Sequence, residues 1–220
     1  ITGCEANVGS ALAAADDART VLEDSTFEGN AAYSGYGGAV YLDEPSPGSA
    51  VTGCTFDGNS AYEGGGMKIY GGSGVTVEGC TFTGNSASGT YYFGGGGLSL
   101  SGTDDVRILT STFSSNSSVT GGGLFIENGT GIEVENSTFD DNQTSNGGGV
   151  ICDTSYEFMY AVGAGIFVID SDLVVRGSTF NGNDAVYSGN TSCTNPTYRF
   201  FFGVGGGIFA RDAAVDVSAE

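Results

Sequence analysis

The chain has 220 residues and a formal net charge of −20, from 6 lysine and arginine residues against 26 aspartate and glutamate residues. A nucleic-acid-binding protein needs a basic surface, so we expect no nucleic-acid partner. The chain contains no histidine, which excludes histidine catalysis and histidine-ligated metals. Its apolar runs are too short for a membrane-spanning helix, so we expect no membrane insertion.

A repeat with three parts runs along the chain. The first part is Phe-x-x-Asn, which begins at Phe27, Phe56, Phe82, Phe113, Phe139 and Phe180. The second part is a glycine-rich segment that leads into alternating apolar residues, at 37–42, 64–69, 97–100, 123–126, 165–168 and 207–210. The third part is a shorter alternating run, as at 75–77, 106–108, 132–134 and 173–175. Alternation with a period of two is typical of strands with one buried face.

Three short strands in each period, with glycine-rich corners between them, predict one coil of a parallel β-helix. We therefore expect an all-β solenoid of about six to seven coils, whose strands pair with those of the next coil about 4.8 Å away. A single coil cannot bury its apolar face, so the stack as a whole would form the core.

The alternation also predicts which residues face inward. The four inward columns are Phe27/56/82/113/139/180, Val40/Met67/Leu98/Leu124/Ile166/Ile208, Leu42/Ile69/Leu100/Ile126/Val168/Ala210 and Leu22/Val51/Val77/Ile108/Val134/Val175. The repeated asparagine falls at a turn. Its amide both donates and accepts hydrogen bonds, so an asparagine column would satisfy backbone groups coil after coil.

The six Phe-x-x-Asn motifs, each followed by Gly-Gly-(Ala/Gly)-apolar-x-apolar, resemble the repeats of chlamydial polymorphic outer-membrane proteins. The resemblance covers the chain from about residue 8 to its end. It implies a right-handed, single-stranded parallel β-helix of the pectin-lyase-like superfold. It also implies an extracellular or cell-surface location, often as an adhesin or passenger segment. The motif pair is specific for the fold and says little about function.

We expect a single β-helix domain over residues 1–220, with loop insertions at 151–164 and 186–204. Both ends resemble interrupted coils. This predicts either a segment of a longer polypeptide or a subunit whose ends pair with neighbours. Residues 10–18 are open to two interpretations, a short capping helix or a strand at Leu12.

Cysteines occur at positions 4, 54, 80, 152 and 193. Cys54 and Cys80 share one repeat position, and we interpret them as small inward residues rather than as a redox or metal pair. Cys152 and Cys193 lie in the two insertions, at nearly equal distances before the next glycine-rich strand. This spacing predicts a Cys152–Cys193 disulfide, and therefore an oxidising compartment.

Five Asn-x-Ser/Thr sequons occur in the chain. Asn116 and Asn142 are ladder asparagines, which we expect to be too buried for modification. Asn128, Asn136 and Asn190 are the glycosylation candidates, provided that the protein is secreted from a eukaryote.

Aromatic residues are concentrated in the two insertions and at outward positions of the nearby strands. The interface candidates are Phe125, Phe167, Phe209, Tyr156, Phe158, Tyr198 and Phe200. In one interpretation the insertions fold back and cover this strand face. In the other, the aromatic surface docks a neighbouring subunit or a ligand, because large exposed apolar patches mark interfaces.

Two ligand classes remain as minor alternatives. A file of threonines precedes the motif phenylalanines, from Thr26 to Thr179, and suits an ice-binding face, but the second file that such a face needs is irregular. Acidic pairs such as Asp104-Asp105 suit calcium, but their spacing matches neither the EF-hand loop nor the Gly-Gly-x-Gly-x-Asp nonapeptide. We expect no cofactor, with calcium as the open alternative.

The rival class is a polysaccharide lyase or hydrolase, since parallel β-helices also house such enzymes. Their sites use clustered carboxylates with a basic residue on one strand face. Arg107 and Arg176, in one strand column near Glu133 and Glu135, are the sparse candidate site. Alternating charges on an exposed face are the ordinary explanation of this group.

The function that we favour is a non-catalytic, extracellular structural or adhesive segment, such as a building block of a surface filament or appendage. We expect self-association or contact with neighbouring subunits through the coil ends and the aromatic insertion face, with glycans as a further ligand class. The high net charge predicts that assembly depends on salt or calcium.

Overall fold

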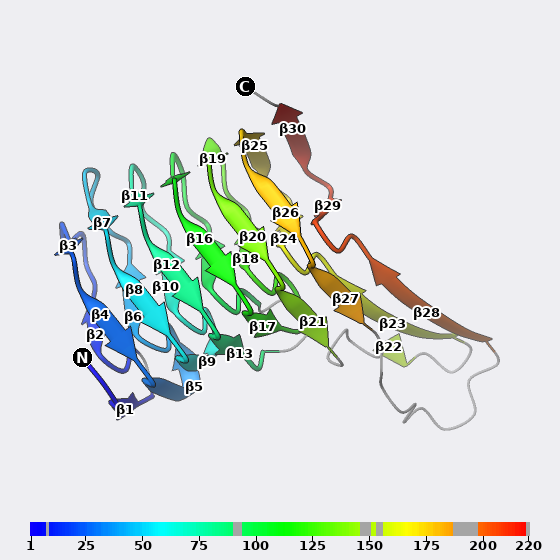
Figure 1. The fold of residues 1–220 in the computed structure, drawn as a ribbon, viewed down its shortest axis with the longest axis horizontal. Coiled ribbons are helices and arrows are strands. Elements are labelled where there is room, and N and C mark those ends of the chain that lie inside the picture. The colour runs from blue at the N-terminus through cyan, green and yellow to red at the C-terminus, as the bar shows by residue number, and fades with distance from the viewer. Residues whose placement is uncertain (8, 90–93, 146–150, 153–155, 187–197, 219–220) are drawn as a thin grey trace.

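The computed structural model describes residues 1–7, 9–89, 94–145, 151–152, 156–186 and 198–218. Within these residues all regular secondary structure is β, and the strands form four parallel sheets that run the length of the molecule (Figure 1). Each coil contributes one strand to each sheet in turn, which is the arrangement of a parallel β-helix. We number the sheets S1 to S4 in the order in which a coil visits them.

Sheet S1 follows the glycine-rich corners. It consists of β2 (Leu12–Ala14), β6 (Val40–Asp43), β10 (Met67–Tyr70), β14 (Leu98–Ser101), β18 (Leu124–Glu127), β24 (Ile166–Ile169) and β29 (Ile208–Arg211). Sheet S2 contains the third part of the repeat. It consists of β3 (Val21–Glu23), β7 (Ala50–Thr52), β11 (Thr76–Glu78), β15 (Arg107–Leu109), β19 (Ile132–Glu135), β25 (Asp172–Arg176) and β30 (Ala214–Ser218).

Sheet S3 carries the motif phenylalanines. It consists of β4 (Thr26–Glu28), β8 (Thr55–Asp57), β12 (Thr81–Thr83), β16 (Thr112–Ser114), β20 (Thr138–Asp140) and β26 (Thr179–Asn181). Sheet S4 follows the motif asparagines. It consists of β1 (Glu5–Ala6), β5 (Ala31–Tyr36), β9 (Ser60–Glu63), β13 (Ser86–Ala87), β17 (Ser117–Ser118), β21 (Gln143–Ser145) and β27 (Asp184–Val186).

The prediction of three strands in each coil is wrong, because S4 adds a fourth. Its strands are short, down to two residues in β13 and β17. The inward residues of S4 are small, such as Ala32, Ala61 and Ala87. Alanine contributes little apolar contrast, so the alternation that reveals the other three sheets is weak here.

The four predicted inward columns are confirmed by the strand registers. Phe82 pairs with Phe56 and Phe113, and the other columns align coil by coil in the same way. The rings of Phe56, Phe82, Phe113 and Phe139 stack face to face, with centroids 4.6 to 4.8 Å apart and planes within 2° of parallel. These side chains are fully buried, so the core is one continuous file of apolar side chains.

The predicted asparagine ladder is confirmed as well. In each step, the side-chain oxygen of one asparagine accepts from the backbone N–H and the side-chain amide of the asparagine one coil earlier, as Asn116 does from Asn85. The amide of Asn85 also donates to the carbonyl of Phe56 at 2.9 Å. The backbone N–H, side-chain amide and side-chain oxygen of Asn85 are thereby all paired inside the protein, where an unpaired group would be costly.

The corner into S1 requires glycine because backbones approach closely there. A Cβ atom on Gly65 would lie 2.4 Å from the carbonyl oxygens of both Gly96 and Ser86. No side chain fits at such a distance. The glycine-rich segment is therefore a packing requirement as well as a turn signal.

Near the start of the chain, the strand interpretation of residues 10–18 holds, since Leu12–Ala14 pair with β6. Cys54 and Cys80 are 1% exposed and lie in the core, as predicted for small inward residues. Burial raises the pKa of the Cys80 thiol to about 11, so this residue is a poor nucleophile and a poor metal ligand at neutral pH.

The two insertions form strands of their own. A separate sheet is made of β22 (Ile151–Cys152), β23 (Tyr156–Val162) and β28 (Tyr198–Val204). Strands β23 and β28 pair in parallel, with Tyr156 opposite Tyr198, so the insertions of consecutive coils lie side by side (Figure 1). Cys193 lies outside the described residues, and so does the side chain of Cys152. The Cys152–Cys193 disulfide therefore stays a prediction.

Candidate functional site

The outer face of S1 changes its chemistry along the molecule. Strand pairing aligns two outward columns on this face. They are Tyr41/Lys68/Ser99/Phe125/Phe167/Phe209 and Asp43/Tyr70/Ser101/Glu127/Ile169/Arg211. The first column is polar in β6, β10 and β14 and entirely phenylalanine in β18, β24 and β29. The polar half contains the chain's single lysine.

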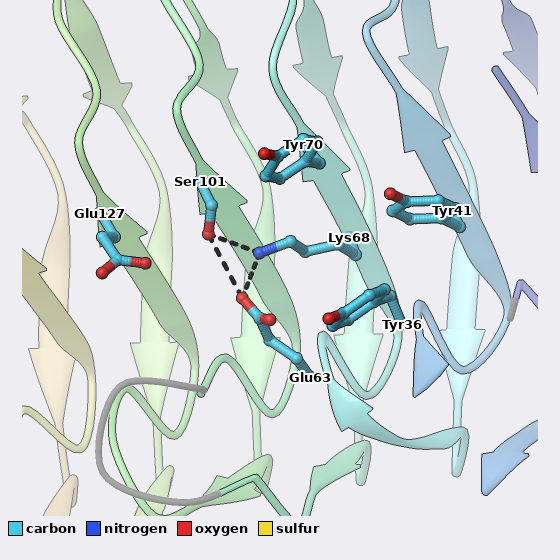
Figure 2. Close-up of a pocket in the computed structure, with 7 residues that line it drawn as sticks. All are labelled: Tyr36, Tyr41, Glu63, Lys68, Tyr70, Ser101 and Glu127. Atoms are coloured by element: carbon cyan, nitrogen blue, oxygen red, sulfur yellow. Dashed lines mark hydrogen bonds and ion pairs between the residues drawn. The ribbon is translucent and has the colours of Figure 1, made fainter. Parts of the chain in front are cut away.

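A pocket of about 260 Å³ opens on this polar half. Its lining consists of Tyr36, Tyr41, Glu63, Lys68, Tyr70, Ser101 and Glu127 (Figure 2). Four S1 strands contribute to it, and Tyr36 and Glu63 come from the ends of the S4 strands β5 and β9, just before the corners into S1. The short corner between β9 and β10 therefore places Glu63 beside Lys68, an outward residue of the next strand in the same coil.

Lys68 and Glu63 form an ion pair on the floor of the pocket. Their side chains are each only 3% exposed. The Lys68 ammonium donates to Glu63 Oε1, to Ser101 Oγ and, at 3.1 Å, to Ser99 Oγ. Ser99 and Ser101 in turn donate to Glu63 Oε1, at 2.9 and 3.3 Å. Figure 2 shows the ammonium between Ser101 and Glu63, with the rings of Tyr70 and Tyr36 above and below it in this view.

Burial perturbs the titratable groups of the pocket. Burial lowers the pKa of Lys68, and the carboxylate of Glu63 opposes that shift. Burial raises the pKa of Glu127, against the attraction of Lys68. Burial and the neighbouring Asp43 raise the pKa of Tyr41. Perturbed groups clustered in a pocket indicate a candidate site, although structural ion pairs perturb pKa values too.

The rim of the pocket is aromatic and accessible. Tyr36 is 39% exposed and Tyr70 is 50% exposed, and the ring centroids of Tyr36 and Tyr41 lie 5.8 Å apart. Phenol rings offer flat apolar faces together with hydroxyl groups, and Glu127 adds a half-buried carboxylate. Such a lining suits a ligand that has both an apolar face and hydrogen-bond donors.

The predicted aromatic face of S1 is covered rather than open. Phe125, Phe167 and Phe209 stack with centroids 5.5 and 5.4 Å apart. Phe125 and Phe167 are 0% and 5% exposed, and they pack with Val162, the last residue of β23. This supports the interpretation that the insertions fold back onto the face. Phe125 and Phe167 are therefore buried within the chain, whereas Phe209 is partly exposed. The role of this surface in an interface stays a prediction.

The remaining interface candidates Tyr156, Phe158, Tyr198 and Phe200 lie in β23 and β28, and their side chains are outside the described part of the chain. Their role in an interface stays a prediction.

The glycosylation candidates divide by exposure. Asn128 and Asn136 are exposed and lie at turns with positive φ, whereas the ladder residues Asn116 and Asn142 are fully buried. Asn190 lies outside the described residues. Modification of these asparagines stays a prediction.

The charged group proposed as a sparse enzymatic site lies on S2, away from the pocket. Arg107 pairs in register with Glu133 and Arg176 with Glu135, so the two arginines do not share a column. Arg107 Nε lies 3.1 Å from Glu133, and Arg176 Nη1 lies 3.0 Å from Glu135. These side chains are 22% to 51% exposed. They are surface ion pairs of small energetic value.

Sequence reasoning missed the pocket around Lys68. The available signal was the single lysine at an outward strand position, with Tyr41 one coil earlier and Tyr70 two residues later. Among the described residues, no group of three or more Cys, Asp or Glu side chains is arranged to hold a metal ion. No helix of the described residues is long and apolar enough to cross a membrane.

Comparison with known families supports the fold. Residues 1–104 match the family described as the right-handed β-helix region, and residues 136–154 match the repeat of the Chlamydia polymorphic membrane protein. The matches confirm the right-handed coil and the resemblance carried by the Phe-x-x-Asn motifs. Searches of curated proteins and of solved structures find no match to this chain.

Proposed function

We propose that the chain is an extracellular, non-catalytic β-helical segment with a structural and adhesive role at a cell surface. The observation that carries the proposal is the unbroken pair of inner files, the stacked phenylalanines and the asparagine ladder, which run through six coils without interruption. A chain whose interior repeats the same phenylalanine and asparagine positions in successive layers gains rigidity along one axis.

The surface location rests on two arguments. The repeat at residues 136–154 is that of a membrane protein family whose relatives we expect at the cell surface. The net charge of −20 keeps such a rod soluble and favours contacts that depend on salt or on divalent cations. Adhesion would use the tyrosine-lined pocket, with self-association through the coil ends and the insertion sheet.

Electron microscopy of the purified protein tests the structural role. We expect rods that associate end to end or side by side, and association should increase as added salt screens the charge. Dispersed particles at every ionic strength, calcium included, would contradict a filament role.

One observation favours a second candidate, a polysaccharide-processing enzyme. The pocket brings together Lys68 and Glu127 from the outer face of S1 and Glu63 from the adjoining corner, and such enzymes use a similar group of carboxylates with a basic residue. Against this, Lys68 is already engaged with three partners and is 2% exposed. Release of new reducing ends or unsaturated sugars from acidic or neutral polysaccharides would support the enzyme. We expect none, and a Lys68→Arg variant serves as the control for contaminating activity.

A further inference from the structure

The Lys68 ammonium lies against Oε1 of Glu63 in a nearly fully buried site. We propose that Lys68 and Glu63 join autocatalytically in the folded chain, forming an amide between Nζ and Cδ, an intramolecular isopeptide bond. The inference stands apart from the adhesive role, since it concerns the chain's own covalent structure.

The first argument is contact and burial. Nζ touches the Glu63 carboxylate, and both side chains are 3% exposed. Groups that a fold holds in a near-attack geometry react as though at effective concentrations of roughly 10⁵–10⁸ M. Water competes poorly at a site so enclosed. A buried ion pair also carries a large desolvation penalty, and the neutral amide relieves it.

The second argument is the pair of serine hydroxyls. Ser99 and Ser101 both donate to Oε1 of Glu63. Attack on Cδ moves negative charge onto one carboxyl oxygen, and two preset donors at that oxygen stabilise the tetrahedral intermediate. The burial that lowers the pKa of Lys68 also favours the neutral amine, which is the nucleophilic form.

The step balances without a co-reactant. The ammonium gives one proton to the carboxylate, which carries it on Oε2, and the freed lone pair on nitrogen forms the C–N bond to Cδ. The C–Oε2 bond breaks, and the departing hydroxyl takes a second proton from nitrogen and leaves as water. The positive and negative charges of the pair disappear together, and one hydrogen remains on the amide nitrogen.

The product would fasten a corner of the helix. Glu63 ends β9 in S4 and Lys68 lies in β10 of S1, so the bond would span the corner at Gly64–Gly66. The serines belong to β14 of the next coil, and they would continue to hydrogen-bond the new amide.

Two measurements on the folded, purified chain test the proposal. Intact mass under reducing conditions should be lower than the sequence mass by one water molecule. Because Lys68 is the only lysine, an amine-reactive reagent applied to the denatured chain should attach once, at the amino terminus, rather than twice. Any purification tag used must lack lysine.

A Lys68→Arg variant keeps the positive charge but cannot form the bond, so it should show the full sequence mass. A Ser99→Ala/Ser101→Ala variant should gain the linkage at least about tenfold more slowly, since each lost oxyanion donor slows comparable steps by a factor of about 10² or more. Full mass with two labels in the native chain, after prolonged incubation at neutral pH, overturns the proposal. Loss of water with two labels overturns it as well, because the water then came from another site.

Discussion

The side-chain oxygen of Asn116 accepts two hydrogen bonds from Asn85, one from the backbone N–H and one from the side-chain amide, each at 3.0 Å. The same two bonds recur along the ladder, so each asparagine ties its own turn to the next coil. The ladder is therefore a series of shared acceptors, and removal of one member affects two coils.

Substitution of Asn85 by alanine should cost about 3 kcal/mol or more. The change removes the shared acceptor of the Asn59 backbone N–H and side-chain amide, of which the amide keeps its bond to the carbonyl of Phe27, and it removes the side-chain donor to the carbonyl of Phe56. Each buried group left unpaired costs about 1–3 kcal/mol. Urea denaturation measures the loss. Asn181→Ala, at an exposed position of β26, is the matched control and should change stability by less than about 1 kcal/mol. Equal losses in the two variants would contradict the ladder's role.

Phe82→Ala should destabilise the chain by about 3–5 kcal/mol, the usual cost of removing a buried aromatic ring. Phe82 is 0% exposed and stacks between Phe56 and Phe113. Thermal denaturation by circular dichroism provides the measurement, with Thr83→Ala on the outer face as the control. A loss below about 1 kcal/mol would mean that the file is not the main core.

Gly65→Ala and Gly58→Ala should differ strongly although they make the same chemical change. A Cβ on Gly65 meets two backbone carbonyl oxygens at 2.4 Å, whereas nothing lies within 4 Å of a Cβ on Gly58. We expect about 3 kcal/mol or more for Gly65, because backbone cannot give way cheaply. Gly58 has a φ of +62° and should cost about 1–2 kcal/mol from left-handed strain alone. Comparison of the urea midpoints of the two variants checks this order. A larger loss of stability in Gly58→Ala than in Gly65→Ala would refute the prediction.

Glu127→Gln should stabilise the protein at neutral pH and not at acid pH. Burial raises the pKa of Glu127 from its ordinary value of 4.5, so the folded chain favours the protonated form. That favourable contribution is fully present below pH 4.5 and is lost as the pH rises through the raised pKa.

The side chain is only half-buried, so we expect a gain of at most about 1 kcal/mol at pH 7, or about 2–4 °C in Tm. The gain should vanish near pH 4. Asp57→Asn, at an exposed strand end, controls for the general relief of charge repulsion. A gain that stays constant from pH 4 to pH 7 would count against the buried carboxylate as its cause.

The sequence was sufficient for the parts of the fold that repeat. Large apolar residues such as Phe56, Val77 and Leu98 alternate with polar ones at a fixed period, and this pattern determines both the strands and their inward columns. Sheet S4 escaped notice because its inward residues are as small as Ala61 and Ala87. The short strands of S4 pair in register with those of the neighbouring coils, as Ala87 does with Ala61.

The candidate site was harder to predict because it depends on exceptions to the repeat. Lys68 stands at an outward position, where a charged residue is ordinarily solvated. It is buried because Glu63 comes from the preceding corner and Ser99 and Ser101 come from the next coil. Glu127 is 59 residues away in sequence, two strands along S1. Such proximity follows from stacking, and no local pattern around Lys68 encodes it.

The change from Tyr41, Lys68 and Ser99 to Phe125 and Phe167 along a single outward column gives the molecule a direction. Inside, successive layers carry similar side chains at the same positions, so the coils follow one another at a constant spacing. Outside, the outer face of S1 changes from polar side chains in β6, β10 and β14 to phenylalanine in β18, β24 and β29, so a partner that binds this face can distinguish one half of the molecule from the other. A uniform spacing between coils, combined with outward side chains that differ along S1, would let one rod present different binding surfaces at fixed separations.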